Sequence, residues 1–273
     1  MHYKVIMMNL QSNKIKFLLI LIVFPLIVMG QNNLNIKLAN EFFKEGDYIK
    51  ASELYSNLYD KHKSRNYYQN LIECYFKLNQ IDNAENLVKK HSKIDKNVSI
   101  LVDFAHVYKL KEEDKKSKKK FNALFKQLEL NPNLVQTAAN KLTKYNYLEE
   151  AIRAYEIALK TSPKSTYRFK LAQLYGQLND LEMMYENYIE VVISNKVYLK
   201  NVKISLTRTI SSDSENENNQ LLKTVLLNKV QQSNNQTISE LLIWLFVQEK
   251  NFEAALDQEK AMDQKLNLIS YNH

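Results

Sequence analysis

Few residues of this 273-residue chain have the types and spacing that catalysis or metal binding requires. The interior histidines, His62, His91 and His106, have no second His or Cys at the spacing of a metal site. Neighbouring carboxylates, as in Glu112-Glu113 and Glu149-Glu150, do not face one another on a helix or turn, so they do not form an acid and base pair. We expect these side chains to be structural or solvent-facing.

Glycine and cysteine are also scarce, which excludes further classes of functional site. The chain has three glycines, whereas a phosphate-cradling loop or a dinucleotide fingerprint needs several close together. It also lacks the H-E-x-x-H and G-x-S-x-G motifs. Cys74 is the only cysteine, so no internal disulfide can form, and a small residue there suits close helix packing better than thiol chemistry. We predict that the chain is not an enzyme and has no cofactor or metal.

The dominant pattern is a repeat. Four small residues and one methionine recur at intervals of 33, 33, 34 and 33 residues. They are Ala51, Ala84, Ser117, Ala151 and Met184. A large apolar residue lies nine positions before each, at Phe42, Tyr75, Tyr108, Leu142 and Tyr175. A constant period of this length indicates one supersecondary unit that is stacked repeatedly. Because Gly and Pro are scarce, each unit is predicted to be a pair of helices, with Gly46 in the first turn.

The unit resembles a known repeat. The fourth unit matches it most fully, with Ala138, Ala139, Leu142, Asn146-Tyr147, Ala151, Tyr155, Ala158 and Pro163. This order of large, small and aromatic residues is similar to the tetratricopeptide repeat. The resemblance implies an all-α fold, an α-solenoid of stacked antiparallel helix pairs that forms a superhelix. Met184, Leu142 and Ile72 depart from the pattern, and we expect looser packing around them.

The resemblance divides the chain. We expect five repeats over residues 31–194, then a divergent helical repeat and a final similar repeat over residues 195–273. The divergent repeat is predicted to have helices from Leu199 to Ile210 and from Leu221 to Val230, separated by a polar loop. In the last repeat, Thr237 and Glu240 are expected to form a capping box, and a helix is expected over Ala254 to Leu266. This end looks uncapped, so we expect either a longer array or a covering partner.

The N-terminus is typical of a targeting segment. Lys4, Lys14 and Lys16 precede an apolar run from Phe17 to Met29, which predicts a signal peptide over residues 1–30 that is cleaved before Gln31. An uncleaved membrane anchor is the alternative, although the run is short for a span. Translation from Met7 or Met8 is equally compatible. We expect an exported protein of the periplasm or outer cell envelope, or a secreted one.

The charge distribution argues against nucleic acid. The formal charge of +8 falls to +5 without the three lysines of the leader. Most of the remainder lies between Lys109 and Lys120, where seven lysines accompany three acids. Nucleic-acid binding needs a more extended basic stripe. This short cluster is either a solubilising edge or a peripheral contact with an anionic envelope surface.

The remaining candidate for function is a surface. The resemblance implies that the first helix of each pair lines a concave inner wall, and its exposed positions there are rich in amides. The expected partner-binding residues are Asn40, Gln69, Glu73, His106, Gln136, Asn140 and Gln173. Amides can donate to and accept from a peptide backbone, so we expect a protein or extended peptide as the partner. Alternatively, these are ordinary surface residues, and the chain is an architectural spacer or a sensor or accessory portion of a longer protein.

Overall fold

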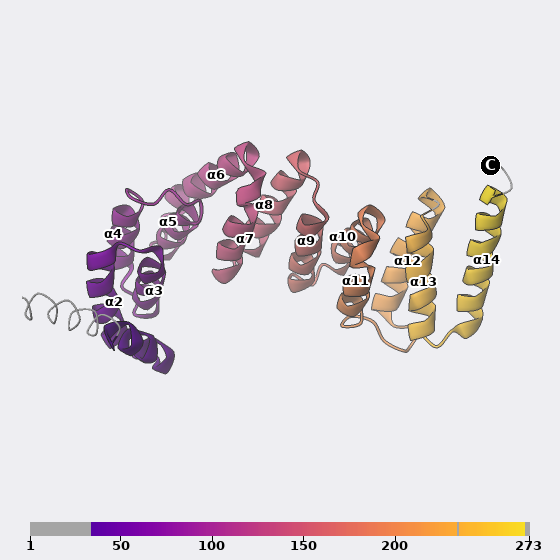
Figure 1. The fold of residues 1–273 in the computed structure, drawn as a ribbon, viewed down its shortest axis with the longest axis horizontal. Coiled ribbons are helices and arrows are strands. Elements are labelled where there is room, and N and C mark those ends of the chain that lie inside the picture. The colour runs from indigo at the N-terminus through magenta and orange to yellow at the C-terminus, as the bar shows by residue number, and fades with distance from the viewer. Residues whose placement is uncertain (1–33, 234, 271–273) are drawn as a thin grey trace, which may run out of the picture. The chain divides into compact units, whose positions relative to one another are not determined.

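The computed structural model describes residues 34–233 and 235–270, and side chains as far as residue 264. All regular secondary structure in these ranges is helical (Figure 1), which confirms the all-α fold class. The expected signal peptide lies outside the described residues. The chain divides into two compact units, with the boundary between Lys118 and Lys119, inside helix α6.

Consecutive helices form pairs joined by short turns. The first unit contains a helix over 34–45, α2 (Tyr48–His62), α3 (Arg65–Lys77), α4 (Ile81–His91), α5 (Ser99–Leu110) and the start of α6 (Asp114–Leu130). The second unit contains the rest of α6, η1 (Pro132–Leu134), α7 (Val135–Lys144), α8 (Leu148–Thr161), α9 (Ser165–Gln177), α10 (Leu181–Ser194), η2 (Lys196–Tyr198), α11 (Leu199–Leu206), α12 (Glu217–Gln232), α13 (Gln236–Gln248) and α14 (Phe252–Ser270).

One turn geometry recurs between the helices of a pair. A residue with left-handed backbone occupies the turn, with φ between +54° and +83°, at Gly46, Asn79, Glu112, Asn146, Asn179 and Lys250. The N–H of the following residue donates to the carbonyl five positions earlier, at 2.8–3.0 Å in all six turns. This bond satisfies a carbonyl that the end of the first helix leaves free.

The small residues of the repeat lie at the centre of the packing. Ala51, Ala84 and Ala151 are fully buried, and Ser117 is buried with its Oγ donating to the carbonyl of Ala105 at 2.9 Å. Each follows its left-handed turn by five residues, so the second helix begins in the same register every time. Cys74 is also fully buried, and burial raises the pKa of its thiol to about 12, as expected of a packing residue.

The helices of the divergent repeat have different bounds from those expected from the sequence. Its first helix, α11, ends at Leu206 and not at Ile210, because Thr207 and Thr209 turn their hydroxyls onto nearby backbone carbonyls. Its second helix, α12, begins four residues earlier than Leu221, at Glu217, and is capped by Asn216. The polar loop between them is present.

Asn219 holds this loop in place of a left-handed turn. Its side chain is fully buried, and its Oδ1 accepts from the N–H of Ser211 at 2.9 Å. Its Nδ2 donates to the carbonyls of Ser211 and Asp213, at 2.9 and 3.1 Å, and to Glu249 Oε1 at 3.2 Å. A single buried amide therefore satisfies several backbone groups of the loop.

The final repeat corrects one expectation. The capping box of Thr237 and Glu240 is wrong, because α13 begins at Gln236 and the Asn235 side chain accepts from the N–H of Thr237 at 2.9 Å. Asparagine is a stronger cap than threonine, so it fixes the start of the helix. Glu240 instead pairs with Lys196 Nζ at 2.6 Å. The last helix, α14, extends beyond the expected Ala254–Leu266 at both ends.

A buried polar cluster joins four helices of the first unit. His91 is 1% exposed and stacks on the ring of Tyr68, with centroids 3.9 Å apart. Its Nδ1 lies 3.1 Å from Tyr59 Oη, and its Nε2 lies 3.3 Å from Asp95 Oδ2 without the alignment of a hydrogen bond. Arg65 holds Asp95 with two bonds of 2.7 and 2.9 Å, and Tyr68 Oη donates to buried Asp103.

The stability of the chain should depend on pH through His91. Burial lowers the pKa of this imidazole below its ordinary 6.5, although Asp95 acts in the opposite direction. The unfolded chain takes up a proton near pH 6.5 and the folded chain only at lower pH, so stability is complete above pH 6.5 and is lost as the pH falls below it. Urea unfolding at pH 7.5 and 5.5 should show this loss, and His91→Phe should reduce it. An equal loss in wild type and variant would contradict the assignment.

Relieving strain at one turn should stabilise the fold. Glu112 is exposed and has φ +59°, a conformation that costs an L-residue roughly 1 kcal/mol or more and costs glycine nothing. Glu112→Gly should therefore stabilise the chain by about 0.5–1 kcal/mol, measured by thermal unfolding. Glu112→Ala removes the same side chain and keeps the strain, so it should give no gain. The same gain from both variants would show that the side chain, and not the backbone, is responsible.

Candidate functional site

Two hollows on one face of α9 form a continuous groove in the second unit. The first, of about 230 Å³, is lined by Ala139, Asn140, Thr143, Tyr155, Lys170, Gln173, Leu174 and Gln177. The second, of about 380 Å³, is lined by Gln173, Gly176, Gln177, Met184, Tyr188, Ser205, Arg208 and Thr209. Gln173 and Gln177 belong to both, so we treat them as one groove, called here the amide groove.

Helix geometry aligns the floor of this groove. Lys170, Gln173 and Gln177 are spaced by three and four residues along α9 and so lie on one face. The wall on the α7 side is a chain of polar contacts, in which Tyr155 Oη donates to Gln136 Oε1 at 3.1 Å and Gln136 Nε2 donates to Asn140 Oδ1 at 2.7 Å. Burial raises the pKa of Tyr155 to about 12, so its hydroxyl remains a donor at neutral pH.

The groove retains hydrogen-bonding capacity for a ligand. Within the described residues, the Nδ2 of Asn140 and the whole side-chain amide of Gln177 form no hydrogen bond, and Gln173 uses only Oε1, which accepts from Lys170 Nζ at 3.0 Å. The charged residues of its lining are Lys170 and Arg208, and both are exposed. The groove therefore offers amide donors and acceptors together with two positive charges.

The structure brings together three of the seven residues expected from the sequence, Gln136, Asn140 and Gln173. Asn40, Gln69, Glu73 and His106 lie on first helices of the other unit. Asn40 is exposed and accepts from Tyr55 Oη at 2.7 Å, and His106 is half-buried with its ring edge-on to Phe76 at 4.8 Å. Gln69 and Glu73 are half-buried on α3.

The expected partner-binding residues come from repeated exposed positions on the first helix of each pair. This choice misses Lys170, Gln177 and Arg208. The stripe of Lys170, Gln173 and Gln177 along α9 is visible in the sequence as three- and four-residue spacing, so it could have been found. Arg208 follows α11 in the divergent repeat, where no repeat position can be counted. Phe169, which precedes Lys170 on α9, packs against Tyr188 and Tyr198 with ring centroids 5.3 and 5.7 Å away.

The base of the groove accommodates the unusual Met184. This side chain is 5% exposed, and α9 and α10 remain in extensive contact, so the expected looser packing is wrong at this position. The reason is Gly176 on the facing helix, where an added Cβ would lie 2.8 Å from Met184 Sδ. Methionine thus fills the space that a side chain at position 176 would take.

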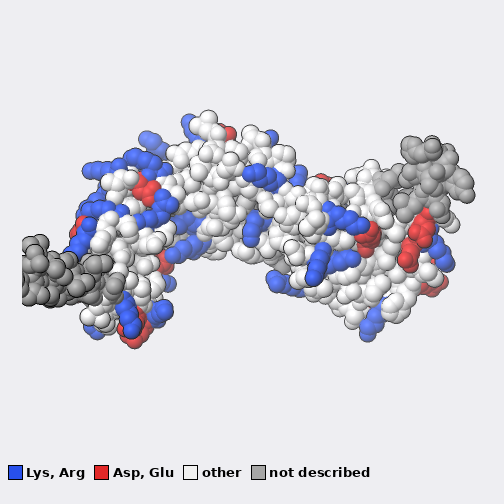
Figure 2. Space-filling model, viewed as in Figure 1, with Lys and Arg blue, Asp and Glu red and all other residues white. Residues whose placement is uncertain are grey.

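The lysine cluster is partly neutralised by acids of the first unit. Lys109 pairs with Asp114 and Lys116 with Glu113, both at 2.7 Å, and Lys111 pairs with Asp82 and Glu85 at 2.8 and 2.7 Å. Lys115 and Lys118 are exposed and form no ion pair within the described chain. Figure 2 shows Lys and Arg side chains gathered around α4 to α6.

The described residues contain neither a metal site nor a membrane-spanning helix. No group of three or more His, Cys, Asp and Glu side chains is placed to hold a metal ion there. In the same part of the chain, no helix is long and apolar enough to cross a membrane.

Comparison with known proteins gives similarity of structure alone. No protein-family model matches the chain, and no curated protein sequence is similar to it. Among solved structures, a thermophilic tetratricopeptide repeat protein of Thermus thermophilus is 14% identical, with a TM-score of 0.37, covering 65% of this chain and 97% of that one.

Two further solved structures are similar at the same level. The C-terminal part of a tetratricopeptide repeat-containing protein from Cytophaga hutchinsonii is 15% identical, with a TM-score of 0.34, covering 84% of this chain and 95% of that one. A tetratricopeptide repeat protein from Parabacteroides merdae is 14% identical, with a TM-score of 0.35, covering 85% of this chain and 92% of that one.

Gly176 and Met184 should be energetically coupled. Alanine at position 176 improves helix propensity by about 0.5–1 kcal/mol but meets Met184 Sδ, whereas in a Met184→Ala background the space is free. Gly176→Ala should therefore be more favourable by about 1 kcal/mol in the Met184→Ala background than in wild type. Urea unfolding of the four proteins in this cycle measures the coupling. Additive effects would show that the two residues do not compete for space.

Proposed function

We propose that the chain is a non-catalytic scaffold that binds a protein segment or extended peptide in the amide groove. The observation that carries the proposal is the alignment of Asn140, Gln173 and Gln177 along one groove with hydrogen-bonding groups unused. Side-chain amides match the alternating donors and acceptors of an extended main chain. The proposal needs no cofactor or metal and no nucleic-acid partner.

The charges of the groove refine the expected ligand. The amides expected from the sequence would not by themselves select the charge of a peptide. Lys170 and Arg208 change this, because they place positive charge in both hollows and no acidic side chain lines either one. The preferred ligand is therefore an extended segment with acidic side chains, bound through its main chain by the amides.

The location of this activity is a separate proposal. The basic and apolar leader over residues 1–30 supports export to the periplasm, to the outer envelope or out of the cell. Exposed Lys115 and Lys118 are compatible with a weak, salt-sensitive contact with an anionic envelope surface. N-terminal sequencing of the exported protein tests cleavage before Gln31.

Binding of defined peptides tests the proposed function. The probes are fluorescent hexapeptides with blocked ends and alternating sequence, Ser-Asp, Ser-Asn or Ser-Lys, measured by anisotropy against the full chain. We expect the Ser-Asp peptide to bind most tightly, and Lys170→Gln and Arg208→Gln each to weaken it about fivefold without affecting the Ser-Asn peptide. Asn140→Ala combined with Gln177→Ala should weaken both peptides, since it removes contacts to the main chain.

The control is Lys126→Gln, which removes an exposed lysine of the same unit outside the groove. It should leave all three affinities unchanged. Equal binding of the three peptides would remove the preference for acidic segments, and unchanged affinities in the Asn140→Ala, Gln177→Ala double variant would overturn the groove as the binding site. Unchanged thermal unfolding of each variant excludes misfolding as the cause.

A further inference from the structure

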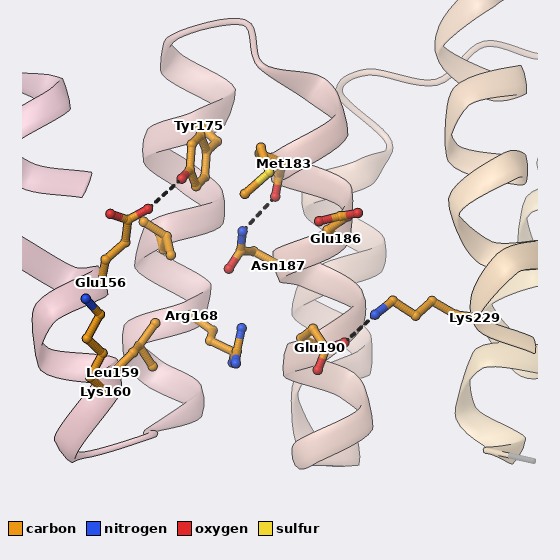
Figure 3. Close-up of a pocket in the computed structure, with 11 residues that line it drawn as sticks. Glu156, Leu159, Lys160, Arg168, Tyr175, Met183, Glu186, Asn187, Glu190 and Lys229 are labelled. Carbon is orange, nitrogen blue, oxygen red and sulfur yellow. Dashed lines mark hydrogen bonds and ion pairs between the residues drawn. The ribbon is translucent and has the colours of Figure 1, made fainter. Parts of the chain in front are cut away.

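A larger hollow, of about 560 Å³, lies on the other side of α9 (Figure 3). Arg168, Leu171 and Tyr175 form its floor, and α8 and α10 form its walls. At 3.6 residues per turn, these positions lie roughly half a turn around α9 from those that line the amide groove. The same helix thus separates two hollows, and this second one, called here the bipolar hollow, contains no residue of the proposed peptide site.

Apart from Glu190, which is paired with Lys229, its charged side chains are separated by sign. Figure 3 shows Lys160, Arg168 and the pair of Lys229 with Glu190 toward one end, and Glu156, Glu186 and Tyr175 toward the other. Along α8, Glu156 and Lys160 are four residues apart, a rise of about 6 Å. The hollow is therefore positive at one end and negative at the other, over a distance close to one helical turn.

Some of these charged side chains form an ion pair or a hydrogen bond, and others form neither. Lys229 Nζ pairs with Glu190 Oε1 at 2.6 Å, and Tyr175 Oη donates to Glu156 Oε1 at 3.0 Å. Arg168, Lys160 and Glu186 form no ion pair or side-chain hydrogen bond with any described residue. Arg168 and Glu186 are half-buried, so part of their hydration is lost without a compensating partner.

The surface between the charges is apolar. Leu159 of α8, Leu171 of α9 and Met183 of α10 contribute to the lining, and Leu171 is 4% exposed. Asn187 on α10 is itself satisfied, because its Nδ2 donates to the carbonyl of Met183 at 2.8 Å. Two helices flanking a third form a trough, and a trough with apolar side chains in its lining accepts an additional helix by packing of ridges into grooves.

We propose that the bipolar hollow docks a helix of a partner protein that carries an acidic and a basic side chain one turn apart beside a small apolar face. The acidic side chain lies against Arg168 and Lys160, and the basic one lies against Glu186 and Glu156. Charge complementarity sets the direction of the docked helix, and Leu159, Leu171 and Met183 contact its apolar side chains. The site is independent of the amide groove and can be occupied when the groove is empty.

The test uses helical probes that differ in one charge. The parent probe is a blocked, alanine-rich helical peptide with one Leu, one Glu and one Lys, the charged residues four positions apart. Two further probes replace its Glu or its Lys with Gln. Anisotropy with the full chain should show that Arg168→Gln weakens the parent about fivefold and leaves the probe without Glu unchanged. Glu186→Gln should likewise weaken the parent and leave the probe without Lys unchanged.

Matched controls lie outside the hollow. Lys126→Gln removes an exposed lysine that lines neither site, and Glu182→Gln removes an exposed glutamate of α10 that does not line the hollow, so neither should change the affinity of the parent. Failure of the parent to bind at about 1 mM would overturn the proposal. So would an equal loss for all three probes in the Arg168 and Glu186 variants, or the same dependence for an unblocked tetra-alanine peptide, which would make the ligand a short zwitterion. Loss of peptide binding in the amide groove alone would leave these outcomes unaffected.

Discussion

The left-handed turn, present in every described helix pair except α11 and α12, is the constraint on which the arrangement of the described helices depends. Its hydrogen bond, from the residue after the turn to the carbonyl five positions earlier, ends one helix and begins the next in a fixed register. A buried residue then follows five positions later, and it is small in every case except Met184. The period of the sequence is therefore the period of this turn, and residues between turns can vary as long as the apolar stripe is retained.

This dependence explains what could be predicted from the sequence. Helix pairs follow from the spacing of residues such as Ala51 and Ala84, and the turn at Gly46 follows from its glycine. The turns at Glu112 and Lys250 have no such signal, because a charged residue in left-handed backbone is tolerated only when the surrounding helices impose it. The early end of α11 and the cap at Asn235 depend on side-chain bonds to nearby backbone, where several polar residues compete and periodicity gives no preference.

The candidate site was predictable only where it follows the repeat. Asn140 and Gln173 occupy repeated positions, so counting finds them, whereas Arg208 belongs to a turn outside the period. The bipolar hollow was not predictable at all from repeat positions, since it is lined by α8, α9, α10 and Lys229 of α12 and depends on how consecutive pairs pack. The amide groove and the bipolar hollow share α9, so this helix presents amides on one side and separated charges on the other.

The loop held by Asn219 has a consequence for how the last repeats unfold. Most repeat arrays unfold approximately as a series of neighbours, each pair contributing its own stability and that of its interface. Asn219 donates to Glu249, which directly follows α13, so the loop before α12 is completed by a residue of the next repeat. Opening the final pair withdraws this acceptor, so Asn219 Nδ2 loses one of its three hydrogen bonds. The stabilities of the two C-terminal repeats are therefore coupled through this buried bond, although the sequence contains two periods there.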